Sequence, residues 1–122
     1  MRLVQTALAP AGLPCFASAW LPTQAQSAPP AAYLVYTLSR REARHSDDVT
    51  TAWSLYVYLE LYSAGDPTQA RRAVDRAMYG AGFAMVEQRE TYDATSEQYR
   101  VSWTWGVQLD SAEEAEIGWD CA

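Results

Sequence analysis

The sequence predicts an α+β fold: a mainly antiparallel sheet of about four strands, with one main helix packed on one face and a short N-terminal helix. Two segments, 53–62 and 98–109, alternate between apolar and polar residues, which is typical of strands with one face in a core. Between them, residues 70–81 repeat apolar side chains at helical spacing. Because one amphipathic helix covers only one face of a sheet, the pattern also predicts a second face without a helix.

The N-terminal region begins with the predicted short helix. Pro10 and Gly12 limit this helix to about two or three turns. Residues 15–20 fit a short edge strand, and the polar, proline-rich residues 23–30 fit a loop. The apolar stripe of the helix consists of Leu3, Val4, Ala7, Leu8 and Ala11.

The first predicted core strand is the apolar run 33–38 (YLVYTL). Residues 39–50 (SRREARHSDDVT) are charged throughout, so we expect them to form a long exposed loop. The alternating strand 53–62 follows this segment. Its apolar side places Val57 and Leu59 in the core beneath the main helix.

The main helix has clear start and stop signals. Asp66 is a suitable N-cap, and Pro67 suits the first helical position. Gly80 and Gly82 favour termination at the other end. The apolar stripe consists of Ala70, Val74, Ala77, Met78 and Ala81.

The last two strands are predicted to form a hairpin. Residues 83–92 fit a weaker strand, and the turn 93–97 leads into the cleaner alternation of 98–109. On the apolar side of this last strand, Trp103 and Trp105 are expected in the core. We therefore expect one domain over residues 1–110, followed by an acidic C-terminal tail, 111–122.

The polar side of strand 53–62 carries an unexpected row of aromatic residues, Tyr56, Tyr58 and Tyr62. A thick aromatic core explains the tryptophans, but these tyrosines lie on the face that the helix does not cover. Tyrosine is favoured in the cores of protein interfaces because it is large and amphipathic. The sequence therefore favours self-assembly or docking onto another protein through this face.

Composition narrows the choice of function. The chain has 122 residues, of which 49% are hydrophobic, so it is long enough for one domain with a core. A formal net charge of -6 argues against tight binding to nucleic acid. No stretch is long and apolar enough to span a membrane.

The two cysteines, Cys15 and Cys121, have neither the spacing of a metal site nor the number of a disulfide framework. We expect reduced thiols in a cytoplasmic protein, with a disulfide bridge between the termini as the alternative.

A signal peptide is a further alternative for the N-terminal region, because no charged residue lies between Arg2 and Arg40. Residues 3–16 would be its apolar region.

No residue pattern indicates catalysis, so we expect a protein that is not an enzyme and has no catalytic, cofactor-binding or metal-binding residues. His45 is the only histidine, and no cysteine or second histidine is close to it in the sequence. The adjacent Asp47 and Asp48 are typical of a turn. Gly80 and Gly82 follow a helix and so cannot present a helix N-terminus to phosphate.

Five segments share their order with one known family. They are 30–36 (PAAYLVY), 60–67 (ELYSAGDP), 81–83 (AGF), 90–92 (ETY) and 99–103 (YRVSW). In this order and spacing they resemble the tail-completion, or tail-terminator, proteins of long-tailed bacteriophages. No single segment is specific, and the likeness rests on the series, which covers roughly residues 1–109.

The resemblance implies a structural virion protein, assembled in the host cytoplasm, without enzymatic activity or cofactor. Members form a ring, commonly of six copies, at the head-proximal end of the tail. The ring ends polymerisation of the tail tube and joins it to the head-completion or connector protein, and DNA passes through without sequence-specific binding. An acidic protein suits such a channel, because basic groups would hold phosphates.

On this hypothesis the interface includes Tyr56, Tyr58 and Tyr62, together with Arg40, Arg41 and Arg44 of the expected loop, which would pair with acidic groups or face the channel. Two alternatives stay open. One is another neck component, such as a head-completion or stopper protein. The other is a small ligand-binding or enzymatic α+β domain, with the aromatic face lining a pocket.

Overall fold

The computed structural model describes residues 2–17, 30–46 and 49–110. In chain order they form helix α1 (Arg2–Leu8), the 3-10 turn η1 (Ala9–Ala11), strands β1 (Cys15–Ala17), β2 (Ala32–Ser46) and β3 (Val49–Ser63), helix α2 (Thr68–Gly80), and strands β4 (Ala84–Asp93) and β5 (Gln98–Asp110). The acidic tail 111–122, which contains Cys121, lies outside the described residues.

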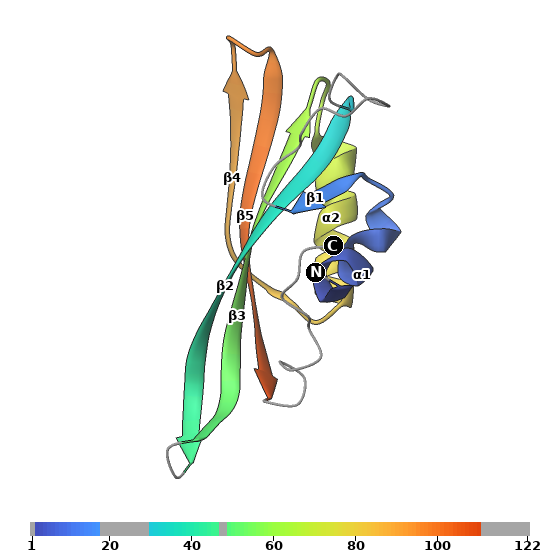
Figure 1. Cartoon of the computed structure of the whole chain (residues 1–122). Coiled ribbons are helices and arrows are strands. Elements are labelled where there is room, and N and C mark those ends of the chain that lie inside the picture. The colour runs from blue at the N-terminus through green and yellow to red at the C-terminus, as the bar shows by residue number, and fades with distance from the viewer. Residues whose placement is uncertain (1, 18–29, 47–48, 111–122) are drawn as a thin grey trace, which may run out of the picture.

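The strands form one five-stranded sheet in the order β1-β2-β3-β5-β4. All neighbours are antiparallel except β1, which runs parallel to β2. Helices α1 and α2 lie against one face of this sheet (Figure 1), which we call the inner face. The predicted α+β class is therefore confirmed. The prediction of about four strands was imprecise, because the short N-terminal strand also joins the sheet.

The segment 39–50 is not the exposed loop that its charge predicts. Strand β2 continues to Ser46 and β3 begins at Val49, so the two strands form a long hairpin that projects past the helices (Figure 1). Its arginines are compatible with a strand because their stems and guanidinium groups cover aromatic rings on β3. Arg40 lies 4.6 Å from the ring centroid of Trp53, and Arg41 lies 5.8 Å from that of Tyr56.

Helix α2 begins one residue later than predicted, at Thr68 with Pro67 as its N-cap, and Asp66 lies just before it. The Asp66 carboxylate accepts hydrogen bonds from the Thr68 hydroxyl at 2.7 Å and from the Thr68 backbone N–H at 3.0 Å. These two bonds hold the pKa of Asp66 below its usual value. After the helix, Gly82 has a φ of 91°, and the Phe83 N–H donates to the Met78 carbonyl at 3.1 Å. Glycine suits this left-handed position, which turns the chain into β4.

The core fills the space between the inner face and the helices. Val57, Leu59 and Trp105 have no exposed surface, and Trp103 is 2% exposed, as the alternation of both strands predicts. The remaining fully enclosed members are Val4, Leu34, Leu61, Val74, Met78 and Val101. The core is thus built from β2, β3 and β5 on one side and from α1 and α2 on the other.

A single carboxylate ties α2 to the sheet. The indole Nε1 of Trp103 donates to Oδ1 of Asp75 at 2.9 Å, and the Gln88 side chain donates to the same oxygen at 3.2 Å. A buried indole N–H without an acceptor destabilises a fold, so Asp75 fixes the helix over β5 and β4. Arg71, one turn earlier, lies 3.9 Å from the other oxygen.

Candidate functional site

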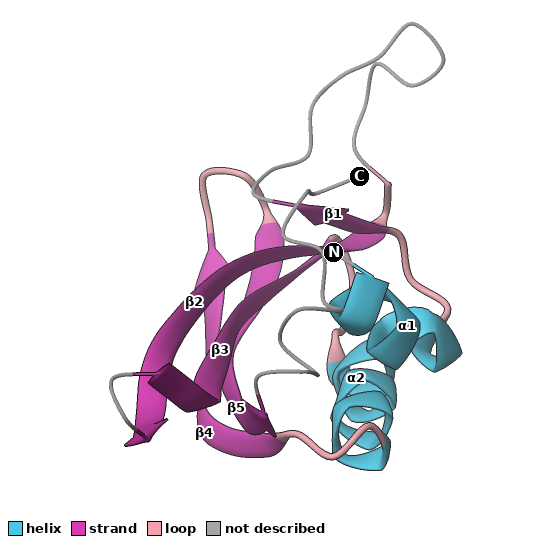
Figure 2. Cartoon of the chain, turned by 60° about the horizontal axis from the view of Figure 1, so that its bottom comes forward, coloured by secondary structure: helices cyan, strands magenta, loops and turns pink. Residues whose placement is uncertain are grey.

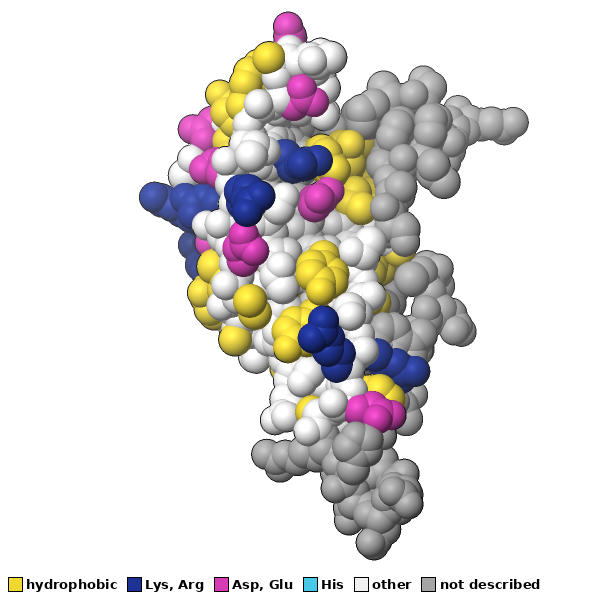
Figure 3. Space-filling model, turned by 90° about the vertical axis from the view of Figure 1, so that its left-hand side faces the viewer, with side chains coloured by type: hydrophobic (Ala, Val, Ile, Leu, Met, Phe, Trp, Pro, Cys, Tyr) yellow, Lys and Arg dark blue, Asp and Glu magenta, His cyan; other side chains and the backbone are white. Residues whose placement is uncertain are grey.

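The face of the sheet opposite α1 and α2 is covered by no described helix (Figures 1 and 2). We call it the outer face, and strand register defines its residues. Its four long strands contribute Tyr33, Val35, Thr37, Ser39 and Arg41 from β2; Ser54, Tyr56, Tyr58, Glu60 and Tyr62 from β3; Arg100, Ser102, Thr104 and Gly106 from β5; and Ala84, Glu87, Arg89 and Thr91 from β4. Figure 3 looks at the molecule from the side opposite the helices and shows hydrophobic and charged side chains interspersed.

The three tyrosines predicted at the interface do share this face, but in different surroundings. Tyr58 is 41% exposed, whereas Tyr56 and Tyr62 are half-buried. Glu60 separates Tyr58 from Tyr62 along the strand and accepts a 2.6 Å hydrogen bond from the Tyr62 hydroxyl. The tyrosines therefore belong to two aromatic groups, one at each end of the face, with Tyr58 between them.

The first group lies beside β1. The Tyr62 ring stacks on Tyr33 with centroids 5.1 Å apart and planes 15° apart, and Phe16 meets Tyr33 edge-on at 6.1 Å. Burial raises the pKa of the Tyr62 phenol, and the hydrogen bond and charge of Glu60 raise it further. Sequence reasoning missed Phe16 and Tyr33 as members, because the register that joins them to Tyr62 is a tertiary property.

The second group surrounds Gly106. Tyr56 lies directly opposite Gly106, and a Cβ at position 106 would meet the Tyr56 ring and Val86 at 3.6 Å each. The aromatic ring thus covers the bare backbone of the glycine, as is common for cross-strand aromatic–glycine pairs. Val86 sits at a β-bulge between Met85 and Glu87 and is 62% exposed. The group leaves apolar surface in water, and Val86 was missed because a bulge breaks the alternation.

The three predicted interface arginines lie on the β2–β3 hairpin, but the structure does not bring them together. Arg41 points to the outer face and joins Tyr56. Arg40 has the opposite parity and lies over Trp53 on the inner side. For Arg44 only the backbone is described, and it pairs with Ala52.

A shallow polar depression of about 250 Å³ lies beside Tyr58 on the outer face. Glu60, Glu87, Arg89 and Arg100 are among its lining residues. Arg89 and Glu87 form an exposed ion pair at 3.1 Å, and the two carboxylates are matched by two guanidinium groups. The formal charges in the lining of the depression therefore sum to zero. We interpret the depression as a polar patch within a contact surface.

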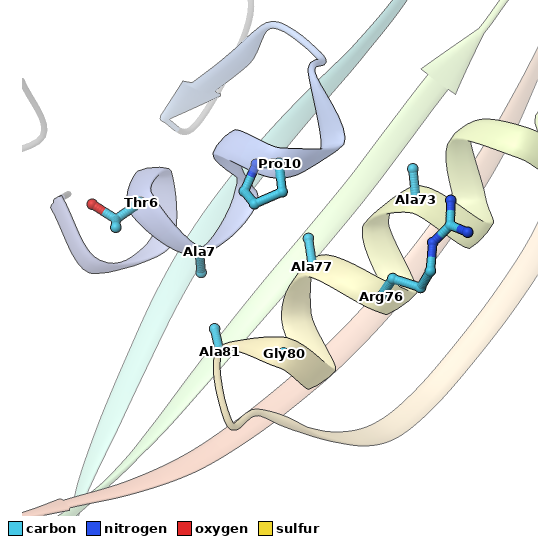
Figure 4. A pocket seen from close by; sticks show the side chains of 8 residues that line it. All are labelled: Thr6, Ala7, Pro10, Ala73, Arg76, Ala77, Gly80 and Ala81. Carbon is cyan, nitrogen blue, oxygen red and sulfur yellow. The ribbon is translucent and has the colours of Figure 1, made fainter.

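A second hollow of about 440 Å³ lies on the helical side, between α1–η1 and α2 (Figure 4). Small residues line it: Ala7 and Pro10 on one side, and Ala73, Ala77 and Ala81 on the other. Arg76 is the one charged side chain in this lining. A groove without convergent polar groups offers packing surface but no chemistry.

The cysteine and metal predictions are addressed only by the described part of the chain. Cys15 is a free thiol, and burial raises its pKa to about 11, so it stays protonated at neutral pH. Within residues 2–17, 30–46 and 49–110, no three His, Cys, Asp or Glu side chains cluster as metal ligands would. No helix in those ranges has the length and apolar character needed to cross a membrane.

Comparison with known proteins adds no relative: neither the protein-family models nor the curated protein sequences match this chain. Fold, surface and the sequence resemblance are therefore the basis for assigning a function.

Proposed function

We propose that this chain is a structural protein of a long-tailed bacteriophage that forms a ring at the head-proximal end of the tail. In this role it ends polymerisation of the tail tube and joins the tail to the head. Six copies per ring are expected from the resemblance of residues 1–109 to tail-terminator proteins. The tail tube protein and the head-completion or connector protein are its partners, and the virion is its location.

The observation that carries the proposal is the outer face of the sheet. A sheet face that only meets water normally carries polar residues, yet here Tyr58 and Val86 are 41% and 62% exposed, and Tyr56 and Tyr62 are half-buried. The rings lie among arginines and glutamates, and this mixture of aromatic and charged side chains is typical of a protein interface. Covering this face with another subunit or with the tube would remove that apolar surface from water.

The charge of the chain suits a ring around DNA. Its net charge of -6 disfavours retention of the phosphate backbone. Of the three arginines on the outer face, Arg89 forms an ion pair with Glu87, Arg100 lines the same depression as Glu60, and Arg41 lies over Tyr56. DNA could therefore slide through the ring without being held.

Two other functions compete with this proposal. A head-completion or stopper protein would use the same kind of surface at another level of the neck. A ligand-binding domain would use the polar depression beside Tyr58, but its volume of about 250 Å³ is small, and Glu87 and Arg89 in its lining already form an ion pair. The oligomeric state of the purified protein distinguishes the ligand-binding alternative from the proposed function, because ligand binding requires no ring.

Deletion of the gene in the phage that encodes the chain tests the proposal and separates it from the stopper alternative. We expect DNA-filled heads beside unattached tails, with some tails longer than those of the wild type, because nothing stops the tube. Electron micrographs of the lysate give both readouts. Detached tails of normal length would favour another neck component, and normal virions would contradict any role in joining head and tail.

A further inference from the structure

The helical side of the molecule has an open groove of about 440 Å³ between α1–η1 and α2 (Figure 4). Its lining is small and apolar: Ala7 and Ala77 are only 7% and 8% exposed, whereas Pro10 and Ala81 are exposed at its margins. Figure 4 shows the alanine methyl groups of α2 directed toward α1–η1. Because protein interiors are close-packed, a hollow with this lining suits a large apolar side chain that comes from elsewhere. We call it the helix groove.

Two arginines of α2 stand beside the helix groove without an acidic partner. Arg76 lines the groove, Arg72 lies one turn before it, and both are exposed. In the described part of the chain neither of them forms an ion pair. Asp75 lies between them in the sequence, but its carboxylate accepts from Trp103 and lies near Arg71. Like charges one turn apart on a helix repel each other, so an acidic group from elsewhere would stabilise this pair.

Residues 111–122, which follow β5, have the complementary composition. They include four acidic residues and no basic residue, a formal charge of -4. They also include two large apolar residues, Ile117 and Trp119. The acidic residues are Glu113, Glu114, Glu116 and Asp120. The segment therefore offers the negative charge and the large apolar side chains that the helix groove lacks.

The chain is long enough to bring this segment to the helix groove. Strand β4 begins at Ala84, which pairs with Gly106 of β5. Ala81, at one end of the groove, precedes Ala84 by three residues, and Asp110 follows Gly106 by four. These connections limit the distance between the Cα atoms of Ala81 and Asp110 to about 30 Å. The nine residues from Asp110 to Trp119 also span about 30 Å when extended, so the indole of Trp119 can reach the groove.

We propose that residues 111–122 bind in the helix groove of their own chain. Trp119 packs against the alanines of α2, and the acidic residues of the segment pair with Arg72 and Arg76. Exposed ion pairs contribute little each, but the segment is tethered, so even a weak contact within one chain is populated. The contact goes beyond the proposed ring and does not depend on it. It holds the acidic segment on the helical side and leaves the outer face free for assembly.

Disulfide trapping in the full chain tests the contact, because Cys121 belongs to the segment. Cys15→Ala removes the other thiol, and Ala81→Cys adds one at the groove. Thr104→Cys is the matched control, since it lies on the outer face and is close to Asp110 along β5. Under a mild oxidant, intact mass spectrometry detects the disulfide as a monomer that has lost two hydrogen atoms. We expect it to form roughly tenfold faster with Ala81→Cys than with Thr104→Cys, because binding raises the local concentration of the Cys121 thiol.

Charge reversal shows whether the two arginines hold the segment. We expect Arg72→Glu with Arg76→Glu to slow the Ala81→Cys disulfide roughly tenfold, and reversal of three glutamates of the segment to do the same. The second variant is Glu113→Arg, Glu114→Arg and Glu116→Arg. All five substitutions together restore opposite charges, and we expect the wild-type rate to within about twofold. This rescue separates docking from an effect of the arginines on thiol reactivity, which would persist in the combined variant. Circular dichroism checks the fold of each variant.

The contact would be overturned by equal rates for the two introduced thiols, by a rate that charge reversal leaves unchanged, or by failure of the combined variant to recover. Disulfide-linked dimers in place of the intrachain disulfide would overturn the assignment to the same chain and give the groove to the segment of a neighbouring copy. Each of these failures leaves the ring proposal standing, because that proposal rests on the outer face and is tested by the oligomeric state.

Discussion

The two faces of this sheet are built from the same strands but differ in how far their side chains are buried. On the inner face, β3 contributes Leu55, Val57, Leu59 and Leu61, none of them more than 1% exposed. On the outer face, the same strand contributes Tyr56, Tyr58 and Tyr62, which remain in part accessible. The inner residues are fully enclosed by contacts within the chain, whereas the outer tyrosines make some contacts and keep part of their surface exposed. The side chains on one side of β3 thus stabilise the fold, and on our proposal those on the other side form contacts with other proteins.

The largest expected effect lies on the inner face. Replacement of Trp103 by alanine empties a site that is 2% exposed and removes the indole that donates to Asp75. We expect the free energy of unfolding to fall by about 3–5 kcal/mol. Chemical denaturation monitored by far-ultraviolet circular dichroism measures this. A midpoint equal to that of the wild type would show that Trp103 does not belong to the core.

A smaller loss is expected when the bond between helix and sheet is removed. Asp75→Ala leaves the indole N–H of Trp103 and the amide of Gln88 without their shared acceptor. We expect a loss of about 1–3 kcal/mol in unfolding free energy. Asp75→Asn is the matched control, because its side-chain oxygen can still accept from Trp103. Equal losses in both variants would mean that charge, and not the hydrogen bond, is what stabilises this contact.

The outer face is expected to respond in the opposite way. Tyr58→Asp should change the unfolding free energy by less than about 1 kcal/mol, since the side chain is 41% exposed. It should nevertheless prevent assembly, because it buries a charge in the contact. Tyr79→Asp is the control from the helical side: it loses an edge-on contact with Trp105, worth about 0.5–1.5 kcal/mol, but should still assemble. The contrast between the two faces would be contradicted if both variants lost stability and still assembled, or if both kept their stability and failed to assemble.

Sequence patterns predicted the parts of the fold that depend on local periodicity. The alternation of 53–62 and 98–109 placed Val57, Leu59, Trp103 and Trp105 correctly in the core, and Asp66 marked the start of α2. The prediction of a loop over 39–50 was wrong because charge was taken as a sign of a loop. In an extended arm, arginines can lie over aromatic rings of the next strand, which a single strand's sequence does not reveal.

The candidate site was predicted only in part, for a related reason. The tyrosines of one strand could be assigned to one face from their spacing alone. Which residues lie beside these tyrosines depends on how the strands pair, and the sequence does not show that pairing. In the structure Tyr33 stacks on Tyr62, and Gly106 and Val86 flank Tyr56. Val86 lies at a bulge, where period-two reasoning assigns a side chain to the wrong face.

The most direct test of the account is the mass of the assembled protein, measured by native mass spectrometry for wild type and Tyr58→Asp at the same concentration. We predict a closed ring, expected to contain six copies, for the wild type and a folded monomer for the variant. A single monomer mass for both proteins, or one ring mass for both, would contradict the claim that the outer face is an assembly surface.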